Sequence, residues 1–449
     1  MVVPRLPMLT TRTDLCSTCA VMGGLTRRRS DLRRSCSNMG GGAANCIIGG
    51  MAFEAFGERD YRLFWTTQFI SNIGSWMQGI AQGWLVYRLT DSPFLLGFVG
   101  FANSIPQFFL MLPGGVVADR FDRRRVVSAS QCVQTLTALW LAIAIYAHRI
   151  TVWQIIAAAI VTGIAMSFSG PAYQAMVVDL LDDRSRLSNA IAMNSLQFNL
   201  SRAIGPLIAG VALSLYGPFW CFFLNAISFL PLIWALGAIK ARQIRHPVSE
   251  AAMLSHLGEA FQYVLRERIV LLLLAIVAAA SLFGYPYLSL LPMIARALFV
   301  NDAKGLGLLM GGIGAGALSG SLVLSVRTPK PSRMTTVILI TLATFGIGLA
   351  GIGFTRQQAP IFALLVLSGA SMVICVALCN TSIQQRIPDA LRGRVLSMYT
   401  FAFSGFLPFG NLFGGILAEH RGFQPTMAVL GGSLIVTAGV AAVLARTSS

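Results

Sequence analysis

The chain has 449 residues, of which 55% are hydrophobic and 11% charged, whereas soluble domains carry about 25% charged residues. Charged side chains are therefore too few to cover a water-soluble fold, which excludes a soluble enzyme, a disulfide-stapled secreted module and a disordered protein. The formal net charge of +17 does not indicate nucleic-acid binding, because the basic residues lie in short loops between apolar runs. The composition predicts a protein that crosses a membrane many times.

Residues 1–58 differ from the rest of the chain, being polar and rich in Ser, Thr, Arg and Gly without helical or strand periodicity. Their arginines do not form an export signal, because no apolar stretch follows them. We expect this head to be disordered. It is either a cytoplasmic tail or an extension upstream of a natural start at Met51. Cys16 and Cys19 have the spacing of a metal-binding pair, but no second pair or histidine follows, so we expect no metal site.

Twelve apolar runs follow, each long enough to cross a bilayer as a helix, the form that satisfies its own backbone hydrogen bonds in lipid. They are expected at 62–88, 93–118, 126–147, 151–176, 187–214, 218–239, 269–294, 305–326, 334–354, 360–384, 395–418 and 423–445. The longest internal loop divides the runs six and six. We therefore expect an all-α membrane protein with a six-helix bundle at 59–239, a cytoplasmic linker at 240–268 and a second six-helix bundle at 269–446.

The loops predict the orientation of the chain. One set, together with the carboxyl end, holds eighteen Lys and Arg residues, and the opposite set holds six. Because positively charged loops stay in the cytoplasm, we expect both termini there. We expect an integral protein of a bacterial-type cytoplasmic membrane.

The first span carries a polar stripe. Its members recur at spacings of 4, 3, 4 and 3, which place them on one helix face: Gln68, Asn72, Ser75, Gly79 and Gln82. Polar side chains are costly in lipid, so the stripe should face an interior cavity; helix–helix hydrogen bonding is the alternative. We expect further cavity residues in later spans, namely Asn103, Gln107, Asn194, Gln197 and Tyr285, the last beside a kink at Pro286.

The loop after the second span contains, in order, Gly115, Asp119, Arg120, Asp122, Arg123 and Arg124. Here the chain resembles the major facilitator superfamily, whose mark in this cytoplasmic loop is Gly-x-x-x-Asp-Arg-x-Gly-Arg-Arg/Lys. The resemblance implies a cytoplasmic gate, in which the glycine permits close helix approach and the aspartate pairs with arginines. Asp122 replaces the second glycine, and the second-half copy is degenerate at Leu324. An ordinary basic loop is the alternative.

The fifth span contains a second motif, Ser201-x-x-x-Gly205-Pro206-x-x-Ala209-Gly210. It resembles the Gly-x-x-x-Gly-Pro-x-x-Gly-Gly motif of proton-coupled drug exporters, and flanking segments resemble the enterobactin-exporter branch. A plain packing motif is the alternative. Gly410-Asn411-x-x-Gly414-Gly415 repeats the pattern 205 residues later. Two repeated six-helix halves are typical of transporters that rock around a central site.

Arg202 is the basic residue placed deepest in a span, about 22 Å along the helix. An ionisable group at that depth suggests a functional site, and no carboxylate is expected at similar depth. We therefore expect a cavity that prefers anionic, zwitterionic or neutral solutes to cationic drugs. The alternative is an arginine satisfied by carbonyl groups near Pro206 or by Asn and Gln side chains.

These observations predict a secondary transporter that exports a small organic molecule, siderophore-like, drug-like or a metabolite, by alternating access. The resemblance implies proton exchange, for which Asp119 or Asp179 is the candidate titrating group. An importer on the same fold and a membrane receptor or scaffold without turnover are the alternatives. We expect neither enzymatic activity nor a cofactor, because no phosphate-binding loop or nucleophilic triad is present. The expected partners are the solute, the lipid bilayer and protons, and the expected state is a monomer that binds no nucleic acid.

Overall fold

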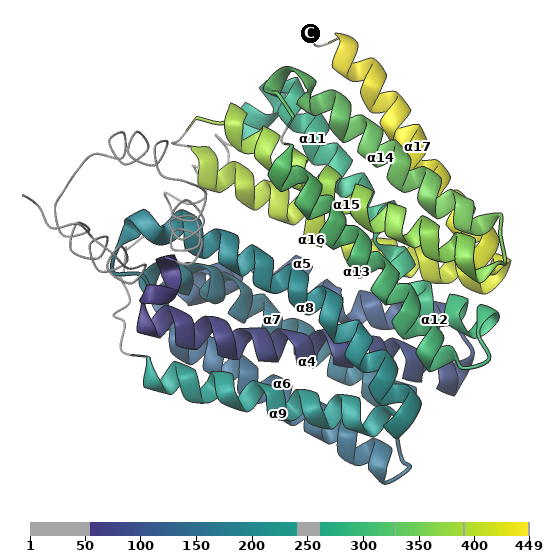
Figure 1. Ribbon diagram of the computed structural model, residues 1–449. Coiled ribbons are helices and arrows are strands. Elements are labelled where there is room, and N and C mark those ends of the chain that lie inside the picture. Colours follow the sequence, from purple (N-terminus) through teal and green to yellow (C-terminus); the bar gives the residue numbers. More distant parts are fainter. Residues whose placement is uncertain (1–53, 240–260, 328, 389–390, 448–449) are drawn as a thin grey trace, which may run out of the picture. The chain divides into compact units, whose positions relative to one another are not determined.

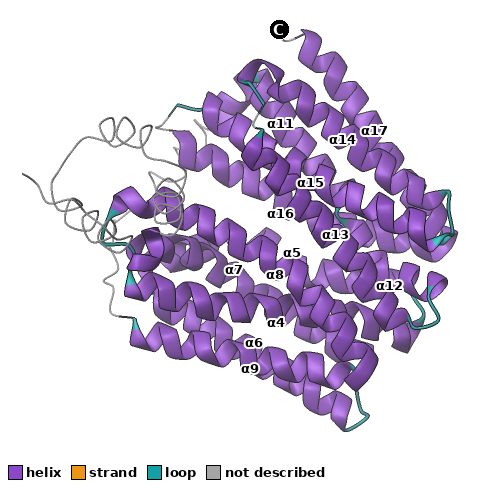
Figure 2. Ribbon diagram, viewed as in Figure 1, coloured by secondary structure: helices purple, strands orange, loops and turns teal. Residues whose placement is uncertain are grey.

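The computed structural model describes residues 54–239, 261–327, 329–388 and 391–447. Within these ranges the chain is helical and contains no strand (Figure 2), so the all-α prediction is confirmed. Cys16 and Cys19, where we expect no metal site, lie outside the described residues, as does most of the 240–268 linker. The long helices are α4 (Arg59–Thr90), α5 (Pro93–Arg120), α6 (Arg123–Tyr146), α7 (Val152–Asp179), α8 (Leu187–Tyr216), α9 (Pro218–Ala238), α11 (Arg268–Ala279), α12 (Pro286–Leu298), α13 (Asp302–Val326), α14 (Pro331–Gly353), α15 (Gln358–Arg386), α16 (Arg392–Arg421) and α17 (Phe423–Thr447).

Among the described helices, 11 are long and apolar enough to cross a membrane, counting α11 and α12 as one span. The long helix outside this set is α4, which has 32 residues. Its length is ample for a crossing, but its Gln, Asn and Ser side chains lower its mean hydropathy. The first expected span is thus the least apolar one because it carries the polar stripe.

Capping residues in the sequence account for where individual helices begin. Ser92 accepts a hydrogen bond from the backbone N–H of Leu95 at the start of α5, and Thr151 forms a capping box with Gln154 at the start of α7. Where a kink is expected beside Pro286, the π-helical turn η3 (Ala280–Gly284) interrupts the α-helix and separates α11 from α12. Proline lacks the N–H group needed to continue a regular helix.

Two groups of helices pack internally, α4–α9 and α11–α17 (Figure 1). We call them the first bundle and the second bundle. They meet mainly where α5 packs on α16 and α8 packs on α13, while α12 also contacts α4 and α5. We call the end of both bundles that carries the α5–α6 and α7–α8 connections the basic end, and the end that carries the α4–α5 and α12–α13 connections the opposite end.

The 205-residue repeat extends to backbone and packing. Helices α8 and α16 have equivalent bounds, and each ends at a glycine in the left-handed region, Gly217 with φ of 82° and Gly422 with φ of 76°. An added Cβ at Gly205 would lie 2.5 Å from the Cβ of Trp76. The equivalent Cβ at Gly410 would lie 3.0 Å from the carbonyl oxygen of Ser281, which is 205 residues after Trp76. The same close helix contact therefore occurs once in each bundle.

Glycines also allow the two bundles to approach closely. A Cβ added at Gly210 of α8 would lie 2.7 Å from the Cα of Gly307 in α13, and one at Gly97 of α5 would lie 2.8 Å from the Cα of Gly415 in α16. Real Cβ atoms do not tolerate such distances. Both contacts lie toward the opposite end, so the bundles are in tight backbone contact there.

Candidate functional site

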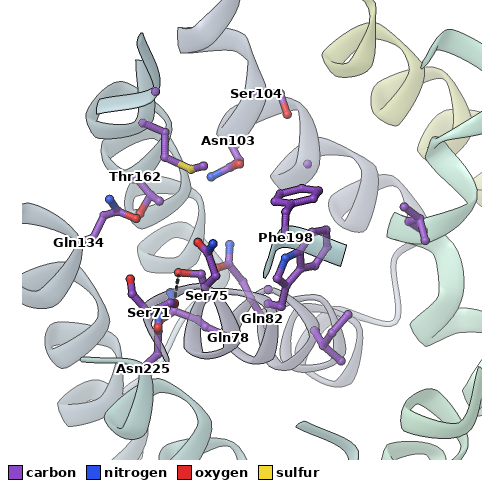
Figure 3. A pocket seen from close by; sticks show the side chains of 18 of the residues that line it. Ser71, Ser75, Gln78, Gln82, Asn103, Ser104, Gln134, Thr162, Phe198 and Asn225 are labelled. Carbon is purple, nitrogen blue, oxygen red and sulfur yellow. Dashed lines mark hydrogen bonds between the residues drawn. The ribbon is translucent and has the colours of Figure 1, made fainter. Parts of the chain in front are cut away.

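A cavity of about 810 Å³ lies among α4–α9 and is closed on one side by α12, α13 and α16 (Figure 3). Its volume is within the roughly 300–1,000 Å³ range of pockets that bind small organic molecules. Of its 37 lining residues, seven come from the second bundle. The first bundle therefore supplies most of the cavity wall.

The polar stripe of α4 lines this cavity along its whole length, since all five predicted members belong to the wall. From Gln68 to Gly83 the wall follows about 22 Å of helix. Gln68 Nε2 donates to Asn72 Oδ1 at 2.9 Å, and Ser75 Oγ donates to the Ser71 carbonyl at 2.9 Å. The stripe faces the cavity and also makes hydrogen bonds within α4.

The predicted amides of α5 and α8 line the cavity as well: Asn103, Gln107, Asn194 and Gln197. Neighbouring helices hold three of them in place. Asn194 Oδ1 accepts a hydrogen bond from the Tyr61 hydroxyl on α4 at 3.1 Å. Asn103 Nδ2 donates to the Ala159 carbonyl on α7 at 3.2 Å. Gln197 Nε2 donates to the Trp65 carbonyl on α4 at 2.7 Å. These bonds join the helices that form the wall.

Several wall residues were not anticipated. Gln131 and Gln134 on α6 and Asn225 on α9 line the cavity, and Asn225 Nδ2 donates to Gln78 Oε1 at 2.7 Å. The i, i+3 spacing of the two glutamines is the signal that could have identified them, because it repeats the helical spacing of the α4 stripe.

The cavity wall carries no charge. Among the 37 lining residues, 13 are Asn or Gln, and none is Asp, Glu, Lys, Arg or His. Trp76 and Phe198 add an aromatic surface, with ring centroids 5.9 Å apart in an edge-to-face arrangement. The wall thus combines many neutral hydrogen-bonding groups with one aromatic patch.

Arg202 and Tyr285 are not among the wall residues. The Arg202 guanidinium lies over the Trp76 ring, 5.9 Å from its centroid, and its Nη2 lies 3.9 Å from Met372 Sδ on α15. Tyr285 packs edge-to-face on Phe403, with centroids 4.8 Å apart. Both residues lie outside the cavity, so their expected contact with solute stays a prediction that this geometry does not favour.

At the basic end, Arg123 is the centre of the predicted gate motif. Its Nη1 lies 2.7 Å from Asp179 Oδ2 on α7, with both side chains largely buried, and its Nη2 lies 3.5 Å from Asp119 Oδ1. Arg124 Nη1 donates to the Ile239 carbonyl at 2.6 Å. These interactions join α5, α6, α7 and the end of α9 within the first bundle. Arg120 is exposed.

Asp122, which replaces a glycine of the family motif, is the N-cap of α6 and accepts a hydrogen bond from the Arg124 backbone. Its φ of −63° does not require glycine. Partial burial raises the pKa of Asp122, but hydrogen bonds from the Arg124 side chain and backbone, with the Arg124 charge, outweigh burial and lower it. A carboxylate that stays ionised suits a helix N-terminus.

The close helix contact expected at Gly115 occurs one residue earlier. An added Cβ at Gly115 would meet nothing within 4 Å, whereas one at Gly114 would lie 2.1 Å from the Ser167 carbonyl oxygen on α7. The motif correctly indicated that α5 makes a close helix contact, but the residue that contacts α7 is Gly114 and not Gly115.

The fifth-span motif serves two helix contacts. Gly205 packs on α4 and Gly210 on α13, while Pro206 and Ala209 are buried within the interface. Ser201 is fully buried, and its Oγ has no hydrogen-bond partner among the described residues. The motif therefore lies where α8 connects the cavity wall to the second bundle.

At the opposite end, polar interactions tie the bundles together. Arg88 Nη1 lies 3.5 Å from Asp302 Oδ2, and Arg296 Nη2 lies 3.2 Å from Asp91 Oδ2. Glu419 Oε2 accepts hydrogen bonds from Ser92 Oγ at 2.8 Å and from the Phe94 backbone N–H at 2.9 Å. We call these three interactions the outer ties, and each joins a first-bundle residue to a second-bundle residue.

A family described as transmembrane secretion effector matches residues 51–447. The staphyloferrin A transporter of Staphylococcus aureus is 26% identical over 382 residues, which cover 83% of this chain and 93% of that protein. The multidrug efflux pump Tap of Mycobacterium tuberculosis is 24% identical and covers 81% of this chain and 88% of its own. Macrolide efflux protein A of Streptococcus pyogenes is 23% identical, with coverages of 83% and 92%.

Solved structures share the fold. The nucleoside transporter NupG aligns with a TM-score of 0.63 at 14% identity and covers 86% of this chain and 98% of its own. A bacterial homologue of the human lysosomal transporter Spinster, crystallised in an inward-facing and unoccupied conformation, aligns with a TM-score of 0.66 at 14% identity, with coverages of 87% and 97%. At this identity the likeness concerns the fold alone.

Proposed function

Because the chain belongs to the transmembrane secretion effector family of major facilitator transporters, we propose that it exports a small organic molecule from the cytoplasm by alternating access. The coarser conclusion is plain: the chain is a membrane transporter of the efflux type and not an enzyme. The observation that supports export of a solute by this chain is the 810 Å³ polar cavity at the meeting of the two bundles.

The orientation of the proposed cycle rests on the loop charges, and its outward direction rests on the likeness to efflux transporters. The positive-inside rule assigns the basic end, with both termini, to the cytoplasm. The glycine contacts and the outer ties then close the route to the exterior. In the proposed cycle, solute enters from the cytoplasm, the outer ties break, and the bundles re-pack to release it outside.

Proton exchange is the proposed driving force. The described cavity wall contains no carboxylate, so the candidate proton acceptor lies at the basic end, where Asp179 pairs with Arg123 at 2.7 Å. Protonation of Asp179 would remove the charge that holds Arg123 and would loosen the link between α6 and α7. Asp119, at 3.5 Å from the same guanidinium, is the second candidate.

The test uses proteoliposomes and a solute panel containing neutral, anionic and cationic members, with a pH gradient of either sign. We expect movement of solute against the proton gradient. A double variant, Arg88→Cys with Asp302→Cys, should stop transport when a bifunctional methanethiosulfonate reagent links the two thiols and regain it when the link is reduced, while each single variant keeps transport. Solute flow together with protons would favour an importer. Transport of no panel member, with a cellular phenotype that survives the cross-link, would favour a receptor or scaffold.

A further inference from the structure

The chemistry of the cavity wall identifies a solute class. We infer that the cavity binds uncharged, polyhydroxylated molecules with an apolar ring face, of which glycosides are the chemical example. This inference rests on the proposed function, because it describes the solute of the same cavity. It narrows the expectation, based on Arg202, that anionic, zwitterionic or neutral solutes are favoured over cationic drugs.

The first argument is the absence of compensating charge. An ion that leaves water for the cavity loses hydration energy, and a fixed counter-charge recovers more of it than neutral polar groups do. None of the 37 wall residues is acidic or basic. The nearby guanidinium of Arg202 lies over the Trp76 ring and interacts with Met372 Sδ and Tyr285. Neither an anion nor a cation therefore finds an ionic partner in this wall.

The second argument is hydrogen-bonding capacity. A carboxamide both donates and accepts, as a hydroxyl group does, and the wall holds 13 carboxamides. Some have bonding capacity to spare, because the amide nitrogen and oxygen atoms of Gln82 and Gln107 make no hydrogen bond to another described residue. A solute with several hydroxyl groups would satisfy these atoms.

The third argument is the aromatic patch. Trp76 and Phe198 line the cavity edge-to-face, and Figure 3 shows Phe198 across the view from the polar side chains of Gln134 and Thr162. An aromatic surface packs well against an apolar face, and a sugar ring offers C–H groups on its face and hydroxyl groups at its edge. The wall thus provides a surface for each part of such a ring.

Binding is tested with three probes that share one coumarin group: 4-methylumbelliferyl β-glucoside, the corresponding glucuronide, and the corresponding 2-amino-2-deoxyglucoside. Each charged probe differs from the neutral glucoside at one position of the sugar. The full chain is placed in lipid nanodiscs, which avoid glucoside detergents. We expect the neutral glucoside to bind at least about tenfold more tightly than either charged probe, a difference of about 1.4 kcal/mol. Equal or tighter binding of a charged probe would overturn the inference.

Variants of Gln82 show whether the wall sets this preference. Gln82→Glu places a carboxylate in the cavity and should improve binding of the cationic probe relative to the neutral one by about tenfold. Gln82→Met keeps the side-chain length without charge and should leave the charge ranking unchanged. Gln107→Glu is the second variant if Gln82→Glu does not fold. Unchanged ranking in both glutamate variants would contradict a solute site at this wall.

The proposed function and the solute class fail separately. If a charged panel member is exported while the glucoside neither binds nor moves, export stands and the solute class is wrong. If the glucoside binds with the expected ranking and no panel member is transported under either pH gradient, the binding class stands and the exporter proposal is wrong.

Discussion

Arg123 is held by two carboxylates and one carbonyl group at the basic end. Its Nη1 contacts Asp179, its Nη2 contacts Asp119, and its Nε donates to the Ala118 carbonyl at 3.3 Å. With side-chain exposures of 13% for Arg123 and 8% for Asp179, this ion pair is shielded more than a surface pair. Removing one partner from such a pair leaves a poorly compensated charge.

Asp179→Asn should therefore reduce transport by at least about tenfold and make the remaining rate insensitive to pH, because the amide neither pairs with Arg123 as an anion nor takes up a proton. The measurement is initial transport rate against pH in proteoliposomes. Asp182→Asn is the matched control, since Asp182 lies exposed in the connection after α7. If the Asp179→Asn variant keeps the pH profile of the original protein, a residue other than Asp179 couples transport to protons.

Arg202 shows why residue type and depth do not suffice to place a side chain. The polar spacing on α4 predicted a shared face, and that face lines the cavity. On α8, Arg202 follows the wall residue Phe198 by four residues and is only about 40° away around the helix, so its position on the helix does not separate it from the wall. The partners Trp76 and Met372 come from α4 and α15, and no pattern within α8 indicates them.

Arg202→Met should accordingly leave the ranking of neutral, anionic and cationic probes unchanged while lowering the melting temperature, because it removes a cation–π contact and not a wall residue. The two readouts are probe binding and thermal unfolding in nanodiscs. A selective loss of anionic solutes in this variant would restore Arg202 as a binding residue.

At the scale of elements, α8 and α16 carry the interface between bundles. Helix bounds followed from the apolar runs and their flanking Pro, Gly and capping residues, and Gly217 and Gly422 end equivalent helices. The interface pairs, α5 with α16 and α8 with α13, required the fold, because they join segments far apart in the sequence. Small residues predicted that helices pack closely, but they predicted neither the partner helix nor the exact contact. The contact expected at Gly115, for example, is made by Gly114.

Gly210→Val should weaken the contact between α8 and α13, since its Cβ would lie 2.7 Å from the Cα of Gly307. We expect a population shift toward the state that is open at the opposite end. The measurement is labelling of Ser75→Cys, in a cysteine-free background, by a membrane-impermeant maleimide added outside. Gly237→Val is the control, because a Cβ at Gly237 meets nothing within 4 Å. Equal labelling of the two variants would contradict the assignment.

At the scale of the whole molecule, the outer ties act together. Three of the four side chains in the two ion pairs are 38–64% exposed, whereas Asp302 is 14% exposed. Exposed ion pairs contribute about 0.2–1 kcal/mol each. A single tie therefore shifts the balance between inward-open and outward-open states by a few-fold at most. Two states of one sequence differ by so little free energy that the apolar pattern could predict the bundles but not which end is closed.

Asp91→Asn, Asp302→Asn and Glu419→Gln should each raise external labelling of Ser75→Cys by less than about fivefold, and the triple variant by about tenfold or more. The three substitutions remove charges that lie on different elements of the two bundles. A single variant with the full effect would show that one tie dominates. No effect in the triple variant would show that the glycine contacts alone close this end.

The first bundle supplies most of the cavity wall, so solute recognition depends mainly on the first half of the chain. With seven of 37 wall residues in the second bundle, substitutions after residue 268 can alter the speed or energetics of the cycle while leaving recognition almost untouched. A hybrid that joins residues 59–239 of this protein to the later half of a relative should inherit this protein's solute preference and the relative's kinetics. Selection for a new cargo would then fall mainly on the earlier half of the chain.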